Sequence, residues 1–258
     1  MSATIHPTAI VSPGAEIGSG VAIGPYAVIE ENVVIGSGSS IGHGAHIAWG
    51  ARLGENVKVF PHAVVGTIPQ DLKFGGEETF LEIGDRTVIR EFATLNRGTA
   101  AHLKTVVGSD CLLMSYSHVA HDCVVGNHCI LANSATLAGH VTIEDWVIIG
   151  GLVPIHQFVR IGCHAMVGGG WRVPKDVPPY ITAAGDPLKP IDINKIGLER
   201  RGFSEETISR LKKAHRILFR SALDMSHALA ELDAQGEMGP EVAHLREFIA
   251  TSERGVIM

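Results

Sequence analysis

The chain has 258 residues, of which 45% are hydrophobic, only 5% are aromatic and 30 are glycine. A formal net charge of -6 argues against a general affinity for nucleic acid or anionic membranes. The first residues lack the basic start and apolar run of a signal peptide, and the longest weakly polar run, residues 147–159, is too short to span a bilayer. We therefore expect a cytoplasmic protein without a membrane span.

Aliphatic residues recur at every sixth position from Ile5 to Val173, with two interruptions after which the same phase resumes. Glycine often follows the aliphatic residue, which indicates a corner that needs either a positive φ or close chain approach. Four residues after the aliphatic position comes a small or β-branched residue, and Cys111, Cys123 and Cys129 occupy this position. We therefore expect these cysteines in the core rather than in disulfides or metal sites.

A period this short predicts a solenoid. Three hexads would make one triangular coil whose sides are short strands, and successive coils would stack like strands in a sheet. We expect this prism over residues 1–190, with loops near residues 67–82 and 100–105, where the phase is broken. The ladder should end between Val173 and Pro179, because the prolines in this stretch cannot donate ladder hydrogen bonds.

Residues 191–258 change to a helical pattern and should form a helical domain that covers the open end of the prism. Ser204 is suited to cap a first helix, a second is expected from Met225 to Ala234, and a third should carry Pro240 in its first turn. The residues expected on the buried faces of the first and third helices are Ile208, Leu211, His215, Leu218, Val242, Leu245, Phe248 and Ile249.

The coil length brings three histidine-containing segments to one edge of the prism. His121, Gly139 and Gln157 would stack above one another, Asp122, His140 and Phe158 would stack one step along, and His118 and His156 fall close by. A neutral histidine can accept the proton of an attacking hydroxyl while a carboxylate fixes its tautomer, and a glycine N–H can stabilise an oxyanion. The pattern favours general-base catalysis with direct attack by the acceptor, because no Ser or Cys stands in an obvious nucleophile position.

Three other interpretations stay open at this point. The histidines can simply favour outward corners of the repeat, as His43, His62 and His128 do. His118 and His121 are three residues apart and could hold zinc near a subunit boundary, as in the prism-shaped gamma-class carbonic anhydrases. A non-catalytic scaffold is the last possibility, and it would be favoured if every substitution of His121 were inert.

The hexad pattern resembles the hexapeptide-repeat acyltransferases, whose prisms are left-handed parallel β-helices and usually trimeric. Within that group the chain is similar to the UDP-N-acetylglucosamine O-acyltransferase family of lipid A biosynthesis. The segments that carry this resemblance are residues 70–73 (QDLK), 118–122 (HVAHD), 126–127 (GN), 131–133 (LAN), 136–140 (TLAGH), 156–158 (HQF) and 200–204 (RRGFS).

The resemblance implies an all-β left-handed parallel β-helix with a C-terminal α-helical domain, assembled as a homotrimer with active sites between subunits. It implies transfer of a (3R)-3-hydroxyacyl group from acyl carrier protein to the glucosamine 3-hydroxyl of UDP-N-acetylglucosamine, with no cofactor and no metal. A related hexapeptide N-acyltransferase acting on an amino sugar is the nearest alternative; such an enzyme should lack the loop at residues 70–73 and the helical tail.

By the same resemblance, His121 is the general base, Asp122 its orienting partner and the Gly139 N–H the oxyanion donor. The residues that would line the sugar-nucleotide and acyl-donor site are Gln70, Asp71, Lys73, His118, His140, His156 and Gln157. Asn194, Arg200 and Arg201 would contact the uridine diphosphate end, since Arg favours phosphate. Gly169, matching the family's acyl-chain ruler, would leave room for a long chain, whereas Trp171 could close the groove.

The chain departs from the family pattern at two further positions. Asn96 stands where the family usually has a histidine, and Ile196 stands where a uridine-binding glutamate is common. We expect Asn96 to remain a polar ligand and the contacts at the uridine end to differ. A basic group where the prism meets the tail would provide a docking patch for the acidic carrier protein, consisting of Arg160, Arg172, Lys175, Lys212 and Lys213.

Overall fold

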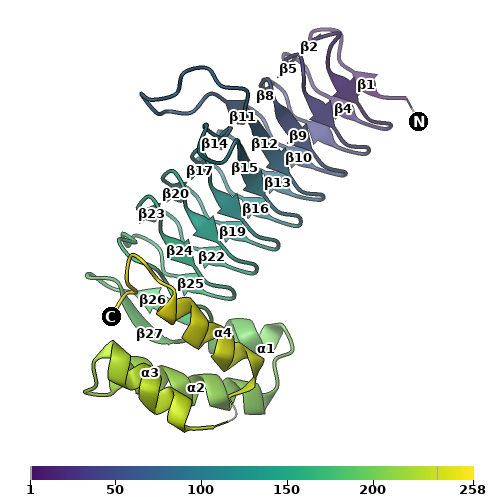
Figure 1. Ribbon diagram of the computed structural model, residues 1–258. Coiled ribbons are helices and arrows are strands. Elements are labelled where there is room, and N and C mark those ends of the chain that lie inside the picture. Colours follow the sequence, from purple (N-terminus) through teal and green to yellow (C-terminus); the bar gives the residue numbers. More distant parts are fainter. Residues whose placement is uncertain (1, 237) are drawn as a thin grey trace.

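The computed structural model describes residues 2–236 and 238–258. It shows a long three-sided prism with its helices gathered at the end opposite the N-terminus (Figure 1). None of the helices in these residues has the length and apolar character needed to cross a bilayer.

Each side of the prism is a sheet of very short strands, and successive strands of one sheet come from successive coils. Sheet A contains β1 (Thr4–Ile5), β4 (Ala22–Ile23), β7 (Ser40–Ile41), β10 (Lys58–Val59), β13 (Val88–Ile89), β16 (Leu112–Leu113), β19 (Ile130–Leu131), β22 (Ile148–Ile149), β25 (Met166–Val167), β26 (Ile181–Ala184) and β27 (Lys189–Ile193). Sheet B contains β2 (Ile10–Val11), β5 (Val28–Ile29), β8 (His46–Ile47), β11 (Val64–Thr67), β14 (Thr94–Asn96), β17 (His118–Val119), β20 (Thr136–Leu137) and β23 (Pro154–Ile155). Sheet C contains β3 (Glu16–Ile17), β6 (Val34–Ile35), β9 (Ala51–Leu53), β12 (Phe80–Ile83), β15 (Lys104–Val107), β18 (Val124–Val125), β21 (Thr142–Ile143) and β24 (Arg160–Ile161).

Except for the antiparallel pair β26 and β27, the strands pair in parallel, and successive coils are in register apart from a shift where Thr67 meets Asn96. Each inward side chain therefore lies on an equivalent one in the next coil. Leu113 pairs with Leu131, Leu131 with Ile149 and Ile149 with Val167, and all four are fully buried. Burial of each such side chain contributes roughly 1.5–3 kcal/mol, which explains how a core with few aromatic rings can be stable. The predicted six-residue register is confirmed.

The second inward position holds the small residues, as expected. Cys111, Cys123 and Cys129 are buried there as free thiols, beside equivalents such as Ala135 and Val141. The fourth cysteine, Cys163, lies outside the inward rows and is only partly buried.

The glycines that follow the aliphatic residues serve close chain approach rather than a positive φ. A Cβ built on Gly108 would lie 2.6 Å from the carbonyl oxygen of Gly126 in the next coil. The positive φ angles fall two residues later, at Asn56 (55°), Arg86 (57°) and Asp110 (58°) in this corner. Of the two expected reasons for glycine at this position, close chain approach is confirmed at residues such as Gly108, and a positive φ applies at Gly66 (90°).

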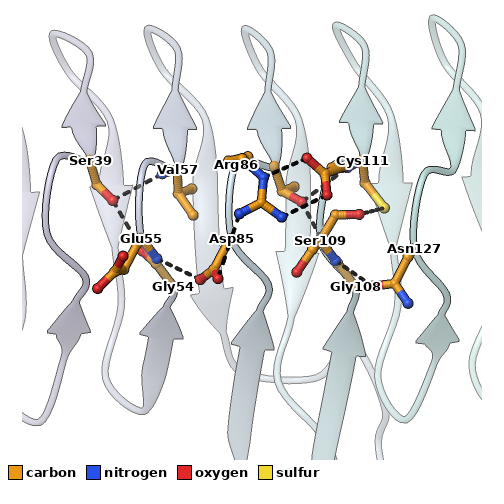
Figure 2. Close-up of polar contacts among 12 residues, drawn as sticks. Ser39, Gly54, Glu55, Val57, Asp85, Arg86, Gly108, Ser109, Cys111 and Asn127 are labelled. Carbon is orange, nitrogen blue, oxygen red and sulfur yellow. Dashed lines mark hydrogen bonds and ion pairs between the residues drawn. The ribbon is translucent and has the colours of Figure 1, made fainter.

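Side chains of the same corner bind the backbone of the neighbouring coil (Figure 2). Asp85 Oδ1 accepts from the Glu55 N–H at 2.8 Å, and Asn127 Oδ1 accepts from the Ser109 N–H at 2.9 Å. These bonds satisfy backbone donors that the tight corner turns away from the strand ladder. The absence of a Cβ on the glycines lets the coils come close enough to form them.

The ladder does not stop at the prolines as predicted. Val173 and Val177 form isolated bridges to Ile155 and Ile161, and β26 then pairs in parallel with β25. The chain reverses only after β26, and β27 then pairs antiparallel with β26. The prolines interrupt individual strands, but inward residues on both sides of them continue to pair with the preceding coil.

The tail contains α1 (Lys195–Arg200), α2 (Glu205–Arg220), α3 (Met225–Ala234) and α4 (Gly239–Ala250). Ser204 caps α2 by accepting from the Thr207 N–H at 3.1 Å, as expected. The residues predicted on the buried faces of α2 and α4 are all buried. The helices share a second apolar core with Tyr180 and cover the end of the prism (Figure 1). The helices begin at Lys195, so β27 crosses the expected boundary at residue 190.

Replacing Gly108 by Ala should lower the free energy of unfolding by about 1–3 kcal/mol, because the added Cβ meets backbone of the next coil. Gly168→Ala is the matched control, since its Cβ would meet nothing nearer than 3.5 Å and should cost at most about 0.5 kcal/mol. Urea unfolding followed by circular dichroism measures both. Equal destabilisation by the two changes would contradict the close-approach explanation.

Candidate active site

The candidate catalytic residues lie at the corner of the prism that follows the strands of sheet B. Both interruptions of the repeat leave from this corner, the first between β11 and β12 (residues 68–79) and the second between β14 and β15 (residues 97–103). His121, Gly139 and Gln157 follow β17, β20 and β23 in the coils beyond. The insertions and the predicted catalytic edge therefore share one corner.

Asp122 is the centre of this corner. It has a φ of 59°, a left-handed conformation that Asp tolerates, and this turn brings its carboxylate back to the preceding residue. His121 Nδ1 lies 2.8 Å from Asp122 Oδ2. The expected orienting partner of His121 is thus in contact with it, although neighbouring residues on a strand would point to opposite sides.

The second loop holds the Asp122 side chain, which is fully buried. The Thr99 hydroxyl donates to Oδ2 at 2.6 Å and the Thr99 N–H donates to Oδ1 at 2.9 Å. Thr105 Oγ1 accepts from the Asp122 N–H at 2.8 Å. Burial acts to raise the pKa of Asp122, but the bonds from Thr99 and His121 outweigh it and hold this pKa below its ordinary value.

An ionised Asp122 can only accept hydrogen bonds. The network therefore assigns the proton of neutral His121 to Nδ1 and leaves Nε2 unprotonated. The His121 side chain is 14% exposed, so its ring is not fully closed off from solvent. The pair has the arrangement required of an oriented general base.

Gly139 lies against the His121 ring in the next coil. A Cβ at Gly139 would be 2.6 Å from Cε1 and 2.7 Å from Nε2 of His121, so only glycine fits. Its neighbours Ala138 and His140 donate their N–H groups to Ile155 and His121 carbonyls. Within the described residues the Gly139 N–H donates to no acceptor, which leaves it free to bind an oxyanion.

His140 completes the group. Its Nε2 lies 3.8 Å from Asp122 Oδ2, its ring meets that of His121 edge-on at 5.1 Å, and it stacks on Phe158 at 4.6 Å. Burial lowers the pKa of His140, with Asp122 opposing the shift. His140 is therefore neutral at neutral pH and can donate or accept hydrogen bonds without adding charge.

The other histidines expected at this edge are present, each with its own partner. His118 Nδ1 lies 2.7 Å from Thr94 Oγ1, and burial lowers the pKa of His118. His156 Nδ1 accepts from Arg254 Nη2 at 2.8 Å, which ties the end of the chain to the edge. Gln157 is exposed beside it.

Gln70, Asp71 and Lys73 lie on the first loop, where Gln70 and Lys73 are exposed. Asp71 Oδ1 accepts from the Lys73 N–H at 3.0 Å, and the Asp71 charge is near enough to His140 to oppose the lowering of its pKa. Of the three loop residues predicted to bind substrate, Asp71 therefore lies close to the same corner.

Asn96 and Arg97 anchor this loop. Asn96 Nδ2 donates to Thr67 Oγ1 at 3.1 Å and to the Ile68 carbonyl at 2.9 Å, and the residue is 2% exposed. Arg97 lies over the Trp49 ring at 4.8 Å and over Phe74 in the loop at 5.5 Å. The Asn96 Nδ2 group is thus committed to holding the loop, whereas Oδ1 is buried with no hydrogen-bond partner among the described residues. That Asn96 is a polar ligand therefore stays a prediction.

The structure does not bring the expected uridine-diphosphate residues to His121. Asn194 Nδ2 donates to the His164 carbonyl and Arg201 Nη2 to the Trp146 carbonyl, at 2.9 and 3.1 Å. Trp146 and His164 lie on the corner that follows sheet C, and Arg200 is exposed next to them. The predicted substrate residues are thus divided between two corners of one chain.

The remaining expected residues lie at the tail end of the prism. Gly169 is exposed, and a Cβ added to it would lie 3.1 Å from the Gly151 carbonyl oxygen. Trp171 is partly buried and packs against the prism core. Ile196 is 64% exposed. In the predicted docking patch, Arg160 stacks on Phe248 at 4.3 Å, whereas the side chains of the other members are exposed, namely Arg172, Lys175, Lys212 and Lys213.

His121, Asp122 and His140 also place one ligand atom each within 4.8 Å of one another, so they could together hold a metal ion. His118, which the zinc interpretation paired with His121, is not a member of this group. Metal binding at this corner therefore needs a direct test, and it would involve the same carboxylate that orients His121.

Sequence reasoning missed Thr99, Thr105 and Arg254. Thr99 lies in the second interruption and Thr105 lies in β15 just after it, so the six-residue phase connected neither residue with the predicted catalytic edge. Arg254 contacts His156 from far along the chain, which a short-range pattern cannot detect. The one available signal for Thr99 was that an interruption next to a catalytic edge tends to carry functional groups.

Replacing Thr99 by Val should lower kcat by about 10-fold, because one of the two bonds that Thr99 donates to the Asp122 carboxylate is lost and proton transfer depends on the geometry of that carboxylate. Thr99→Ser keeps the hydroxyl and should therefore retain the wild-type kcat, an outcome that a role in packing alone would not predict. Thr87→Val is the matched control, since its buried hydroxyl bonds the Gly108 carbonyl at another corner and should affect stability rather than kcat. Steady-state kinetics on the three variants measures the effect; equal kcat losses in the Thr87 and Thr99 variants would contradict it.

Comparison with known proteins shows which family this chain resembles. A family model described as Udp N-acetylglucosamine O-acyltransferase, Domain 2, matches residues 176–257, and the bacterial transferase hexapeptide model matches residues 26–61 and 104–139. The acyl-[acyl-carrier-protein]–UDP-N-acetylglucosamine O-acyltransferase of Myxococcus xanthus is 53% identical over 255 residues, covering 98% of this chain and 99% of that protein. Its counterpart from Anaeromyxobacter sp. is 51% identical over 253 residues, covering 98% of both chains.

Solved structures give the same result. A UDP-N-acetylglucosamine acyltransferase from Bacteroides fragilis matches with a TM-score of 0.97 and 48% identity, covering 99% of this chain and all of that one. A related structure from Acinetobacter baumannii matches with a TM-score of 0.94 and 43% identity, covering 98% and 99%. The fold is therefore a left-handed parallel β-helix with a helical C-terminal part, as expected.

Proposed function

The chain belongs to the UDP-N-acetylglucosamine O-acyltransferase family. From this premise we propose that it transfers a (3R)-3-hydroxyacyl chain from acyl carrier protein to the glucosamine 3-hydroxyl of UDP-N-acetylglucosamine in lipid A biosynthesis. His121 acts as the general base, and neither a cofactor nor a metal takes part.

The reaction proceeds by direct attack on the acyl thioester of the carrier protein. His121 Nε2 accepts the proton of the sugar 3-hydroxyl as its oxygen bonds to the thioester carbonyl carbon. The negative charge that develops on the carbonyl oxygen is stabilised by the Gly139 N–H. The carbon–sulfur bond then breaks, and the departing thiolate takes the proton back from His121, which leaves a free carrier thiol and the acylated sugar.

The main support for this proposal is the set of contacts that the His121 imidazole makes. Asp122 binds His121 Nδ1 at 2.8 Å and Gly139 lies against the opposite part of the ring, with its N–H unpaired within the described residues. A buried carboxylate, an oriented base and an adjacent oxyanion donor are the groups that acyl transfer to a hydroxyl requires.

The test measures acyl transfer to UDP-N-acetylglucosamine from 3-hydroxyacyl carrier proteins of graded chain length, with plain acyl donors alongside. His121→Ala should lower kcat by about 10²–10⁴-fold, because proton transfer by a positioned side chain contributes that much. Activity of the wild-type chain should survive a chelator. The preferred donor length reports whether Gly169 or Trp171 limits the acyl groove.

Two outcomes would contradict the proposal. Turnover with an amine acceptor but not with the sugar hydroxyl would favour the N-acyltransferase alternative. Rapid loss of activity with a chelator and recovery with zinc would favour metal catalysis at His121, Asp122 and His140.

We further propose that the chain acts as a homotrimer whose active sites lie between subunits. The support is the division of the predicted substrate residues between two corners, with His121 after sheet B and Arg201 after sheet C. A single bound sugar nucleotide could contact both groups if one chain supplied the catalytic corner and its neighbour the other. Cyclic symmetry would then repeat this arrangement at every interface.

Mixed assemblies test this arrangement. His121→Ala and Arg200→Ala should each lower activity strongly as pure proteins, the second through a higher KM. Chains mixed in equal amounts after unfolding and reassembly should recover about a quarter of wild-type activity, because every mixed trimer contains one interface with neither substitution. Reassembly of each pure variant is the control. Recovery no greater than the average of the two pure variants would show that both residues act within one chain.

A further inference from the structure

A second group of potential metal ligands lies away from the catalytic corner. Glu144 directly follows β21, Cys163 follows β24 one coil further along, and His244 lies on α4. Each side chain offers one ligand atom, and the three atoms lie within 4.8 Å of one another. The group is therefore at the joint between the prism and the helix that Figure 1 shows lying across its last coils.

The carboxylate of Glu144 already organises this group. Its Oε2 accepts from the Cys163 N–H at 2.8 Å and lies 2.8 Å from His244 Nε2. The bond from the backbone fixes the carboxylate beside the thiol, and His244 reaches it from the tail. The side chains of His244 and Glu144 are 40% and 28% exposed, so solvent has access to the group.

The geometry points to a zinc site, and we propose that Glu144, Cys163 and His244 bind one Zn²⁺ with water as the fourth ligand. A tetrahedral zinc with bonds of about 2.0–2.3 Å separates its ligand atoms by about 3.3–3.6 Å, which small rotations of these side chains can provide. Thiolate, imidazole and carboxylate together suit zinc, whereas Mg²⁺ and Ca²⁺ prefer oxygen ligands alone. On binding, the Cys163 thiol loses its proton to solvent as its sulfur bonds to the metal.

The ion would link the tail to the prism rather than take part in acyl transfer. Glu144 and Cys163 belong to the corner that follows sheet C, while His121 and Asp122 belong to the corner that follows sheet B. A metal held by two coils and α4 would stabilise the covering of the prism end. The inference is independent of the proposed reaction, since its test measures binding and stability.

The chain provides a matched control for this site. His227 Nδ1 lies 2.8 Å from Asp224 Oδ2 on the exposed surface at the start of α3. This pair has the same histidine–carboxylate distance as His244 and Glu144, but it is not part of a three-ligand group among the described residues. If an exposed His–carboxylate pair were enough to bind Zn²⁺, the His227–Asp224 pair should bind it as well as the His244–Glu144 pair does.

The experiment uses full-length protein stripped of metal and titrated with Zn²⁺ against a chromophoric chelator. The wild-type chain and the His227→Gln and His121→Ala variants should bind one Zn²⁺ per chain. Cys163→Ser and His244→Gln should each weaken binding by about 100-fold or more, because even outer-shell changes cost 10–100-fold. Co²⁺ should give a thiolate charge-transfer band that is absent from Cys163→Ser.

Thermal unfolding gives a second readout. Saturating Zn²⁺ should raise the midpoint of the wild-type chain by about 5 °C and leave that of Cys163→Ser unchanged. Failure of the wild-type chain to bind Zn²⁺ at micromolar concentration would overturn the proposal. Binding that survives Cys163→Ser but is lost in His121→Ala would also overturn it, because the metal would then be at the catalytic corner.

Discussion

The structure depends on the in-register stacking of one coil on the next. A slip of one residue would turn every inward aliphatic side chain toward solvent, so the register is fixed along the whole prism by the cumulative burial of residues such as Leu131 and Ile149. Glycines such as Gly108 allow the close approach that this stacking requires. The position of every corner residue, catalytic or not, follows from this constraint.

At the catalytic corner the same constraint brings together residues that are distant in sequence. His121 and Gly139 are equivalent positions of adjacent coils, so the ring of the first necessarily lies against the backbone of the second. The left-handed conformation shared by Asp122, His140 and Phe158 directs their side chains along one edge. A rigid prism can thereby hold an imidazole and a neighbouring backbone N–H in fixed positions, which is the preorganisation that the proposed acyl transfer needs.

Most of the prism and much of this corner could be predicted from the sequence, because a six-residue phase determines which residues face inward and which stack. The phase also placed His121 beside Gly139 and Asp122 beside His140. It gave no information about Thr99, which lies in an interruption, or about the role of Asn96, whose partners are Thr67 at the end of β11 and Ile68 at the start of the first loop. The sequence left open whether each glycine serves close approach or a positive φ, because both depend on the absence of a Cβ and sequence alone does not separate the two.

The location of the two interruptions has a physical explanation. An insertion within a strand would break the inward register, whereas one at a corner can be extruded and the ladder can resume in phase, as β11, β14 and β17 do. Both insertions occur at the corner of His121, and each supports it, the first by carrying Asp71 and the second by binding Asp122 through Thr99. The loops thus supply the polar contacts that a repeat of aliphatic and small residues cannot provide. The candidate catalytic residues and both departures from the repeat therefore share one corner.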